Sequence, residues 1–278
     1  MLKLIRINVI KIELLSLKVI YSIHRWSVPT MSENVKVTEK LPRFRTIEMQ
    51  YRPMFDVHLN MAIDYYARLQ LNDKSMGYIL PETYIPVAEK SRQIYDLGKI
   101  ALEEVCDAIK RCEKRDVGID CVMLWTSNKQ MNKKTFFKDM KKIVDKKEIN
   151  PDKICFYLTE SILQEDSEII AQNINDLREY GFIVAIDDFG VEFSSLANLG
   201  QYEVDYIGLN ESLLENILID ERQQNMVQGI IDFAKKIETR VIVGGIDSPE
   251  KEELLKKMGA DRLSGELYGN YLKEKDIK

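Results

Sequence analysis

The sequence has few of the residues that bind transition metals. It contains only two histidines, His24 and His58, and its four cysteines form no CxxC pair. This composition disfavours a zinc site and predicts reduced cysteines in a cytoplasmic protein. An excess of positive charge is also missing: the net charge is -5, with acidic and basic residues interspersed. We therefore do not expect DNA or RNA as a main partner.

Long apolar runs are missing as well. No run approaches the roughly 20 residues that a membrane-spanning helix needs. Residues 1–22 are rich in Ile, Leu and Val, but charged residues interrupt them at Lys3, Arg6, Lys11, Glu13 and Lys18. The segment fits a signal peptide poorly, because no small-residue cleavage site follows it. It is either a basic amphipathic helix on a membrane surface or, as we favour, a stretch upstream of a true translation start at Met31.

From Phe44 onward, short apolar runs alternate with helical patterns. Strands are predicted at 46–51, 63–69, 120–125, 154–158, 182–186, 204–208, 241–243 and near Arg262. Helices are predicted at 95–114, 134–147, 167–180, 211–236 and 250–258, with Ser248 as the N-cap and Gly259 as the end of the last one. Strands that alternate with helices imply a parallel sheet, and eight of them predict a closed α/β barrel of the (β/α)8, TIM-like type. We expect residues 1–43 to be an N-terminal extension and residues 44–278 to form one barrel domain.

Two adjacent carboxylates follow one of these buried strands. In the segment IVAIDDFG at 183–190, four apolar residues lead directly into Asp187 and Asp188. Active sites of α/β barrels form at the carboxyl ends of the strands, and paired carboxylates there suit Mg²⁺ or Mn²⁺. The alternative is a solvated turn in which one aspartate caps the next helix.

Several segments around these aspartates resemble the EAL domain, the cyclic-di-GMP phosphodiesterase family, between about Glu48 and Leu272. The similar segments are 85–89 (IPVAE) with Leu97-Gly98, 156–161 (FYLTES), 187–196 (DDFGVEFSSL), Val204-Asp205 and 241–248 (VIVGGIDS). The resemblance implies a TIM-like barrel in which two Mg²⁺ or Mn²⁺ ions activate a water to cut cyclic-di-GMP to linear pGpG.

At several positions that the family uses for this chemistry, the sequence has other residues. Under the resemblance, Asp64 takes the place of the first glutamate of the Glu-Ala-Leu signature. Five metal or catalytic positions are substituted at Met123, Tyr157, Gly208, Asn210 and Gly244, and Ser264 replaces a glutamine. Asp187, Asp188 and Glu160 match the family. We therefore expect a degenerate EAL domain with no catalytic residues and no cofactor, in which any residual Mg²⁺ or Mn²⁺ binds weakly at Asp64, Asp187 and Asp188.

Ligand binding is a separate question from catalysis. Arg68 matches a family arginine that contacts ligand phosphate, although a salt bridge with Asp64 explains it equally well. Asp64 and Glu160 would line the same ligand site. Tyr65, Tyr66, Tyr157 and Trp125 either stack on guanine bases or fill the space of the absent metals. The remaining site is acidic, which disfavours phosphates.

We therefore predict an inactive EAL-like regulatory protein that binds a protein partner or cyclic-di-GMP in bacterial signalling. A partner would dock on the surface of residues 211–236, and a homodimer is left open. One alternative is a divergent metal-dependent phosphodiesterase that uses Asn210 and Glu266 as replacement ligands. Another is a barrel enzyme with a different substrate and Asp187 or Asp188 as its general base.

Overall fold

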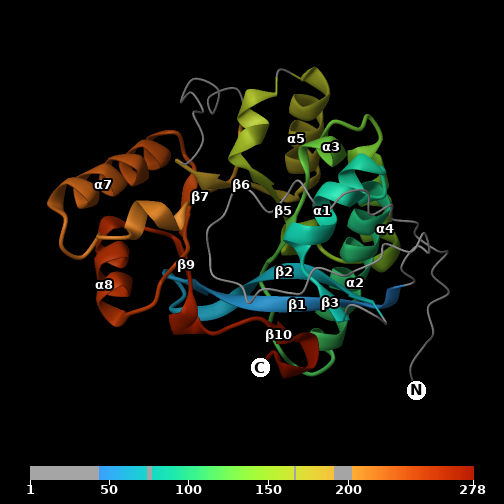
Figure 1. The fold of residues 1–278 in the computed structure, drawn as a ribbon, viewed down its shortest axis with the longest axis horizontal. Helices are drawn as coiled ribbons and strands as arrows, with labels where there is room; N and C mark the ends of the chain where they lie inside the picture. Colours follow the sequence, from blue (N-terminus) through green and yellow to red (C-terminus); the bar gives the residue numbers. More distant parts are fainter. Residues whose placement is uncertain (1–43, 74–76, 166, 191–201) are drawn as a thin grey trace, which may run out of the picture. The chain divides into compact units, whose positions relative to one another are not determined.

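A closed β-barrel forms the centre of the fold (Figure 1). The computed structural model describes residues 44–73, 77–165, 167–190 and 202–278. One sheet has the order β10-β1-β9-β8-β7-β6-β5-β4-β2-β3, and an additional pairing of β1 with β2 closes eight of these strands into the barrel. The eight are β1 (Phe44–Asp56), β2 (Met61–Asp73), β4 (Val122–Trp125), β5 (Ile154–Thr159), β6 (Ile183–Phe189), β7 (Tyr206–Leu209), β8 (Arg240–Val243) and β9 (Arg262–Ser264). The predicted α/β barrel is confirmed.

The predicted parallel sheet is wrong for the first strand. From β2 through β4 to β9, neighbouring barrel strands are parallel. In contrast, β1 runs antiparallel to β9, with Met54 opposite Ser264 and Asp56 opposite Arg262. The reason is the short connection at residues 57–60, because a crossover between parallel strands needs a dozen residues or more. Residues 49–53 of β1, which precede this paired stretch, therefore lie at the carboxyl ends of the parallel strands.

The helices largely follow the sequence pattern. They are α1 (Pro81–Lys90), α2 (Ile94–Glu113), α3 (Asn128–Met131), α4 (Phe136–Lys147), α5 (Glu168–Tyr180), α7 (Glu221–Lys236) and α8 (Pro249–Met258), with short 3-10 segments that include η3 (Glu160–Gln164) and η4 (Glu211–Leu214). The single helix predicted at 211–236 is wrong, because η4 and α7 are separate. The helices α1 and α3, together with the strands β3 (Gly77–Ile79) and β10 (Leu272–Lys273), were not predicted.

The chain forms two compact units. One comprises residues 1–48 and 70–95, and the other comprises residues 49–69 and 96–278. In the described part of the first unit, β3 pairs antiparallel with the end of β2, placing Leu71 opposite Ile79. Every candidate site residue belongs to the second unit. The predicted extension at 1–43 and the start at Met31 lie outside the described residues and stay predictions. Within the described ranges, no helix is both long enough and apolar enough to cross a membrane.

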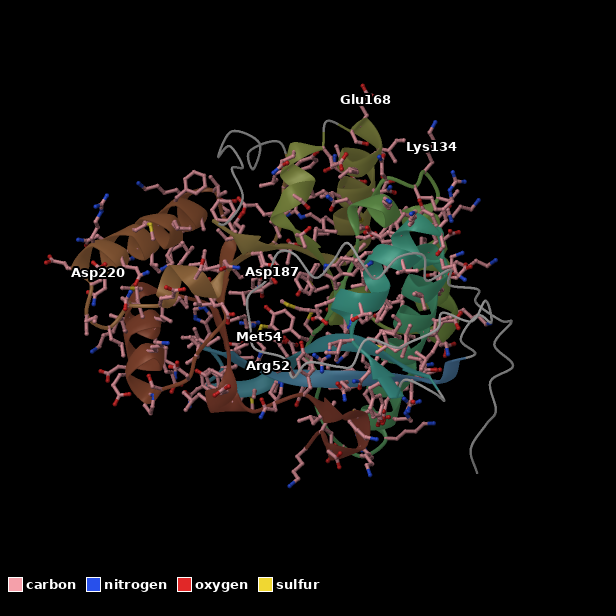
Figure 2. The ribbon with its side chains drawn as sticks, viewed as in Figure 1. Arg52, Met54, Lys134, Glu168, Asp187 and Asp220 are labelled. Carbon is pink, nitrogen blue, oxygen red and sulfur yellow. The ribbon has the colours of Figure 1, made fainter. Side chains whose placement is uncertain are left out.

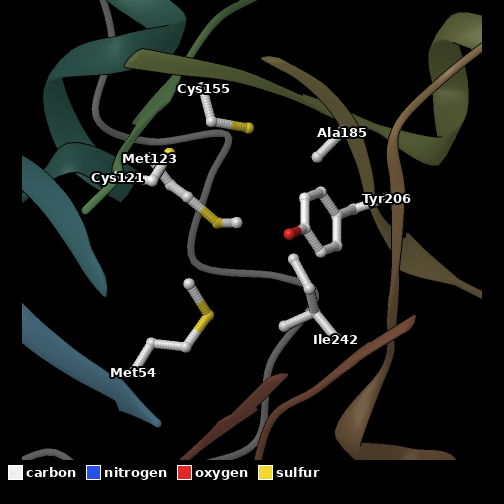
Figure 3. Packing of buried hydrophobic residues seen from close by; sticks show 7 residues of the cluster. All are labelled: Met54, Cys121, Met123, Cys155, Ala185, Tyr206 and Ile242. Carbon is white, nitrogen blue, oxygen red and sulfur yellow. The ribbon is translucent and has the colours of Figure 1, made fainter. Parts of the chain in front are cut away.

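Sulfur-containing and apolar side chains fill the barrel interior (Figure 3). This cluster comprises Met54, Cys121, Met123, Cys155, Ala185, Tyr206 and Ile242, all at most 5% exposed. Burial of one large apolar side chain stabilises a fold by about 1.5–3 kcal/mol. Met123, at a position that the resemblance assigns to metal binding, is therefore a packing residue here. Polar side chains lie beyond the two ends of this filled interior.

Candidate functional site at the carboxyl ends of the barrel strands

The paired aspartates lie at a break in the regular strand pairing. The register between β6 and β7 shifts between Ile186 and Phe189. Within this break Asp188 has a φ of 59°, a left-handed conformation that aspartate tolerates better than most residues. Asn210 Nδ2 donates a hydrogen bond to Asp188 Oδ1 at 2.9 Å. Asp188 is exposed, whereas Asp187 is partly buried.

The carboxyl group of Asp187 ionises close to neutral pH. Burial, and then the negative charge of Asp188, raise the pKa of Asp187 to about 6, although a hydrogen bond with the Tyr157 side chain opposes the shift. Burial also raises the pKa of Tyr66 and Tyr157, and the charge of Asp187 adds to both shifts. Both phenols are therefore neutral at physiological pH. Asp187 is surrounded by neutral groups and by one further acid rather than by cations.

A glycine makes room for the carboxyl group of Asp187. A Cβ placed on Gly208 would lie 2.1 Å from Asp187 Oδ1, so any side chain at 208 would collide with it. The family resemblance assigns a lysine to position 208, and here the carboxyl group of Asp187 takes that space. Gly244 is different, because a Cβ there would be 3.8 Å from Ser264 Oγ, an ordinary contact.

Two tyrosine rings lie beside Asp187. The rings of Tyr66 on β2 and Tyr157 on β5 have centroids 5.4 Å apart and meet at 62°. Both pack against the interior cluster, where Tyr66 pairs in register with Met123. Both rings are partly buried, and whether they also stack on guanine bases stays a prediction.

Asp64 is not where the resemblance led us to expect it. Its side chain is buried, accepts a hydrogen bond from the Cys121 N–H at 3.0 Å and pairs with Arg262. Arg262 also pairs with Asp56 at 2.5 Å. Tyr66, two residues further along β2, is the residue of this strand that lies beside Asp187. Two residues of a strand span almost 7 Å. The spacing between Asp64 and Arg68 in the sequence does not show how the hairpin of β1 and β2 is aligned, and therefore does not show which residue of β2 lies beside Asp187.

Glu160 supports the end of β6. It is buried at the start of η3, and its Oε2 accepts a hydrogen bond from the Gly190 N–H at 3.1 Å. Glu160 therefore fixes the backbone that follows the two aspartates. Residues 191–196 of the matching DDFG segment lie outside the described residues.

Arg68 contacts an aromatic ring and an amide rather than the carboxylate of Asp64. Its Nη2 donates to Gln50 Oε1 at 2.8 Å, and its Cζ lies 3.8 Å from the ring centre of Tyr271. Arg52 lies over the same ring, with its Cζ 6.0 Å from the centre. The Nε atoms of both arginines are buried and have no hydrogen-bond partner in the described structure.

Sequence reasoning missed Gln50, Arg52 and Tyr271. Alternation along β1 is a pattern that could have found the first two, because Met54 and Asp56 both point inward and residues two apart share a face. Nothing in the local sequence distinguishes Tyr271 as a site residue.

The described side chains do not fit the two-metal arrangement that the resemblance implies. Outside the gaps at 1–43, 74–76, 166 and 191–201, no three His, Cys, Asp or Glu residues are grouped so that they could hold a metal ion. Two ions in working geometry need many oxygen ligands and compensating negative charge. Here Asp64 forms an ion pair with Arg262. Tyr66 on β2 and Tyr157 on β5 lie beside Asp187.

Comparison with known proteins identifies the family. Residues 36–271 match the EAL domain, so the chain belongs to this family. PdeR of Escherichia coli K12, a cyclic di-GMP phosphodiesterase, is 30% identical over 204 residues, which cover 73% of this chain and 30% of PdeR. Signaling protein YkoW of Bacillus subtilis 168 is 25% identical over 84% of this chain and 30% of YkoW. The chain thus spans about 30% of the length of these curated relatives.

Solved structures share the fold. The PaMucR phosphodiesterase in complex with c-di-GMP matches with a TM-score of 0.77 at 20% identity, covering 84% of this chain and 95% of that chain. The FimX EAL domain of Xanthomonas citri in complex with c-diGMP matches with a TM-score of 0.73 at 11% identity, covering 82% of this chain and 88% of that chain. At these identities the comparison shows the fold alone.

Proposed function

We propose that this chain is a degenerate EAL domain that binds cyclic-di-GMP without hydrolysing it and acts as a regulatory protein in signalling. The observation that carries the proposal is the guanidinium group of Arg68 at the carboxyl ends of the barrel strands, with its Cζ 3.8 Å from the ring centre of Tyr271, a ring that Arg52 also approaches at 6.0 Å. Arginine binds phosphate through parallel hydrogen bonds, and a ring that holds it in place lowers the cost of binding. Family membership supplies the candidate ligand.

The two arginines also change the expected charge of the site. The acidic residues alone favoured a protein partner over the nucleotide. Arg68 was already expected at the site, and Arg52 beside the ring of Tyr271 adds one further positive charge. This balance favours an anionic ligand more than the sequence suggested.

The absence of hydrolysis is supported by the arrangement around Asp187. A hydrolase would need metal ligands and a cation near the attacked phosphate. In place of these the described site has Tyr66, Tyr157 and the bare backbone of Gly208. Loss of one electrostatic contributor typically costs about 10²–10³ in rate, and such groups act as a unit. That the protein needs no cofactor also belongs to this proposal.

The test is calorimetric titration of the full chain with cyclic-di-GMP in EDTA. We expect a saturable heat with a Kd below about 10 μM, and we expect GMP, with one guanine, to bind more weakly. A flat titration would contradict the nucleotide proposal.

A second candidate function is protein binding. Three apolar side chains near the start of α7 are exposed: Leu218 by 43%, Ile219 by 86% and Met226 by 45%. They lie within residues 211–236, where we expected a partner surface. Exposed apolar side chains that cluster mark interaction sites in many proteins. A second copy of this chain is one partner that such a surface would suit.

A further inference from the structure

Lysine is concentrated in one segment of the chain, around the helix α4. Residues 129–153 contain nine lysines, no arginine and four acidic residues, although the whole chain has a net charge of -5. Four of these lysines follow one another at steps of four residues and are all exposed: Lys134, Lys138, Lys142 and Lys146. Figure 2 labels Lys134, just before α4, with its side chain pointing away from the ribbon. We call these four residues the lysine row.

The lysine row runs along the outer face of α4. The buried face of this helix consists of four apolar residues: Phe136, Met140, Ile143 and Val144. Four residues advance an α-helix by about 6 Å and turn it by about 40° beyond one full turn, so the three lysines within α4 lie inside about 80° of its circumference. Side chains four residues apart are neighbours on a helix, and like charges at this spacing repel each other.

Among the described residues, no carboxylate pairs with the lysine row. The acids of α4 pair with other lysines instead. Asp139 Oδ2 lies 3.0 Å from Lys133 Nζ. Asp145 Oδ2 lies 2.7 Å from Lys141 Nζ. The positive charge of the row is therefore not compensated within the described ranges, and an anionic partner would reduce the repulsion along it.

The composition of the lysine row distinguishes between kinds of anionic partner. Protein interfaces have few lysines and are rich in aromatic residues, methionine and arginine. None of the exposed large apolar side chains of the described residues lies between 129 and 153. Sites for nucleic acids add arginine and stacking aromatic rings, and this segment has no arginine. A row of exposed lysines on a helix suits the headgroups of anionic lipids, which attract lysine through its charge alone.

The acidic residues are concentrated on another side of the barrel. Residues 203–238, which include α7, contain eight acidic and three basic residues. In the strand order, β7 before α7 is three strands from β4 before α4, and Figure 1 shows the two helices on opposite sides of the barrel. An anionic surface would therefore attract the lysine row and repel the side of α7, which would orient the protein on that surface.

We propose that the lysine row is a docking surface for a membrane that contains anionic phospholipids. The contact is electrostatic and lies at the lipid headgroups, because the apolar face of α4 is buried against the protein and is not free to insert. The inference is independent of the proposed nucleotide site, since no residue of that site belongs to the lysine row.

The experiment measures co-sedimentation of the full chain with vesicles of phosphatidylcholine alone and of an equal mixture of phosphatidylcholine and phosphatidylglycerol. We expect binding only to the mixed vesicles, and release as NaCl rises from about 0.05 M to about 0.5 M. The α4 variant, Lys138→Gln/Lys142→Gln/Lys146→Gln, should weaken binding about a hundredfold, because each lysine near an anionic surface strengthens binding about fivefold. If this variant does not fold, Lys142→Gln alone should weaken binding about fivefold.

The matched control is Lys235→Gln/Lys236→Gln/Lys257→Gln, which removes the same charge from exposed positions on α7 and α8. It should leave binding unchanged, and equal weakening in both variants would overturn the proposal. Wild-type protein that stays in solution with both kinds of vesicle also overturns it. Equal binding of the wild type and the α4 variant would place the contact elsewhere in the chain. Binding of duplex DNA but not of vesicles would assign the row to nucleic acids instead of lipids.

Discussion

The ionisation state of Asp187 depends on its place in the fold. An aspartate in an unfolded chain has a pKa of about 3.9, whereas burial and Asp188 raise the pKa of Asp187 in the folded protein to about 6. Between these values the folded state binds the proton more tightly. The contribution of Asp187 to stability therefore falls as the pH rises from about 4 to about 6 and stays low above that range.

Asp187→Asn should therefore stabilise the protein at neutral pH. The amide keeps the shape of the side chain and removes the buried charge. We expect the free energy of unfolding to rise by about 1–3 kcal/mol at pH 7 and by much less at pH 4, measured by urea unfolding at both values. Asp232→Asn, at an exposed position on α7, should show no such pH dependence. An equal gain at both pH values would contradict the assigned burial of the Asp187 charge.

Gly208 provides a second test at the scale of single residues. A methyl group at 208 would collide with the Asp187 carboxyl group, so Gly208→Ala should destabilise the protein by about 1–3 kcal/mol. In an Asp187→Ala background most of this cost should disappear, which a double-mutant cycle by urea unfolding would show. Gly229→Ala is the control, since a Cβ there meets nothing within 4 Å and alanine favours the helix α7. The same cost in both backgrounds would contradict the contact.

The sequence indicated about half of this site. The acids Asp187 and Asp188 were recognisable because they follow an apolar run, and Arg68 because it matches a motif. Asp64 was assigned because it takes the place of the first glutamate of the Glu-Ala-Leu signature, and a motif match cannot show which inward position of β2 lies beside Asp187. Arg52 could not be placed correctly while β1 was taken to be parallel, because a parallel strand would point it to the other end of the barrel.

At the scale of elements, the barrel strands were predictable and the start of α7 was not. The eight barrel strands follow from apolar runs, and the Ser248 cap and the Gly259 end of α8 are confirmed. The break before α7 was missed because helical periodicity continues through it. Asp220 begins that helix instead, with its side chain accepting hydrogen bonds from the N–H groups of Arg222 and Gln223.

The cap on α7 gives a prediction for this element. Asp220→Ala leaves two backbone N–H groups without their acceptor and should lower the free energy of unfolding by about 1 kcal/mol. Asp220→Ser keeps a side-chain oxygen at the cap and should retain most of the stability. Urea unfolding of the two variants separates these cases. Equal loss for alanine and serine would show that the hydrogen bonds from Asp220 do not determine where α7 begins.

At the scale of the whole molecule, the residues that pack the barrel interior are different from those of the proposed ligand site. A filled interior of Met, Cys and Tyr side chains stabilises the closed sheet, and the ion pairs of Arg262 lie among buried residues at Asp56 and Asp64. At the carboxyl ends of the strands, Tyr66 lies close to both Asp187 and Tyr271, and Arg68 lies against the ring of Tyr271. The sequence predicted this architecture and its family.

One measurement tests the central proposal most directly. The full chain is titrated with cyclic-di-GMP in Mg²⁺ and, separately, in EDTA, and the nucleotide is then recovered and separated by chromatography. We predict similar affinity in both conditions and recovery of the intact cyclic dinucleotide. Linear pGpG formed in Mg²⁺ would contradict the proposed loss of hydrolysis, and the absence of both binding and product would leave protein binding as the function to pursue.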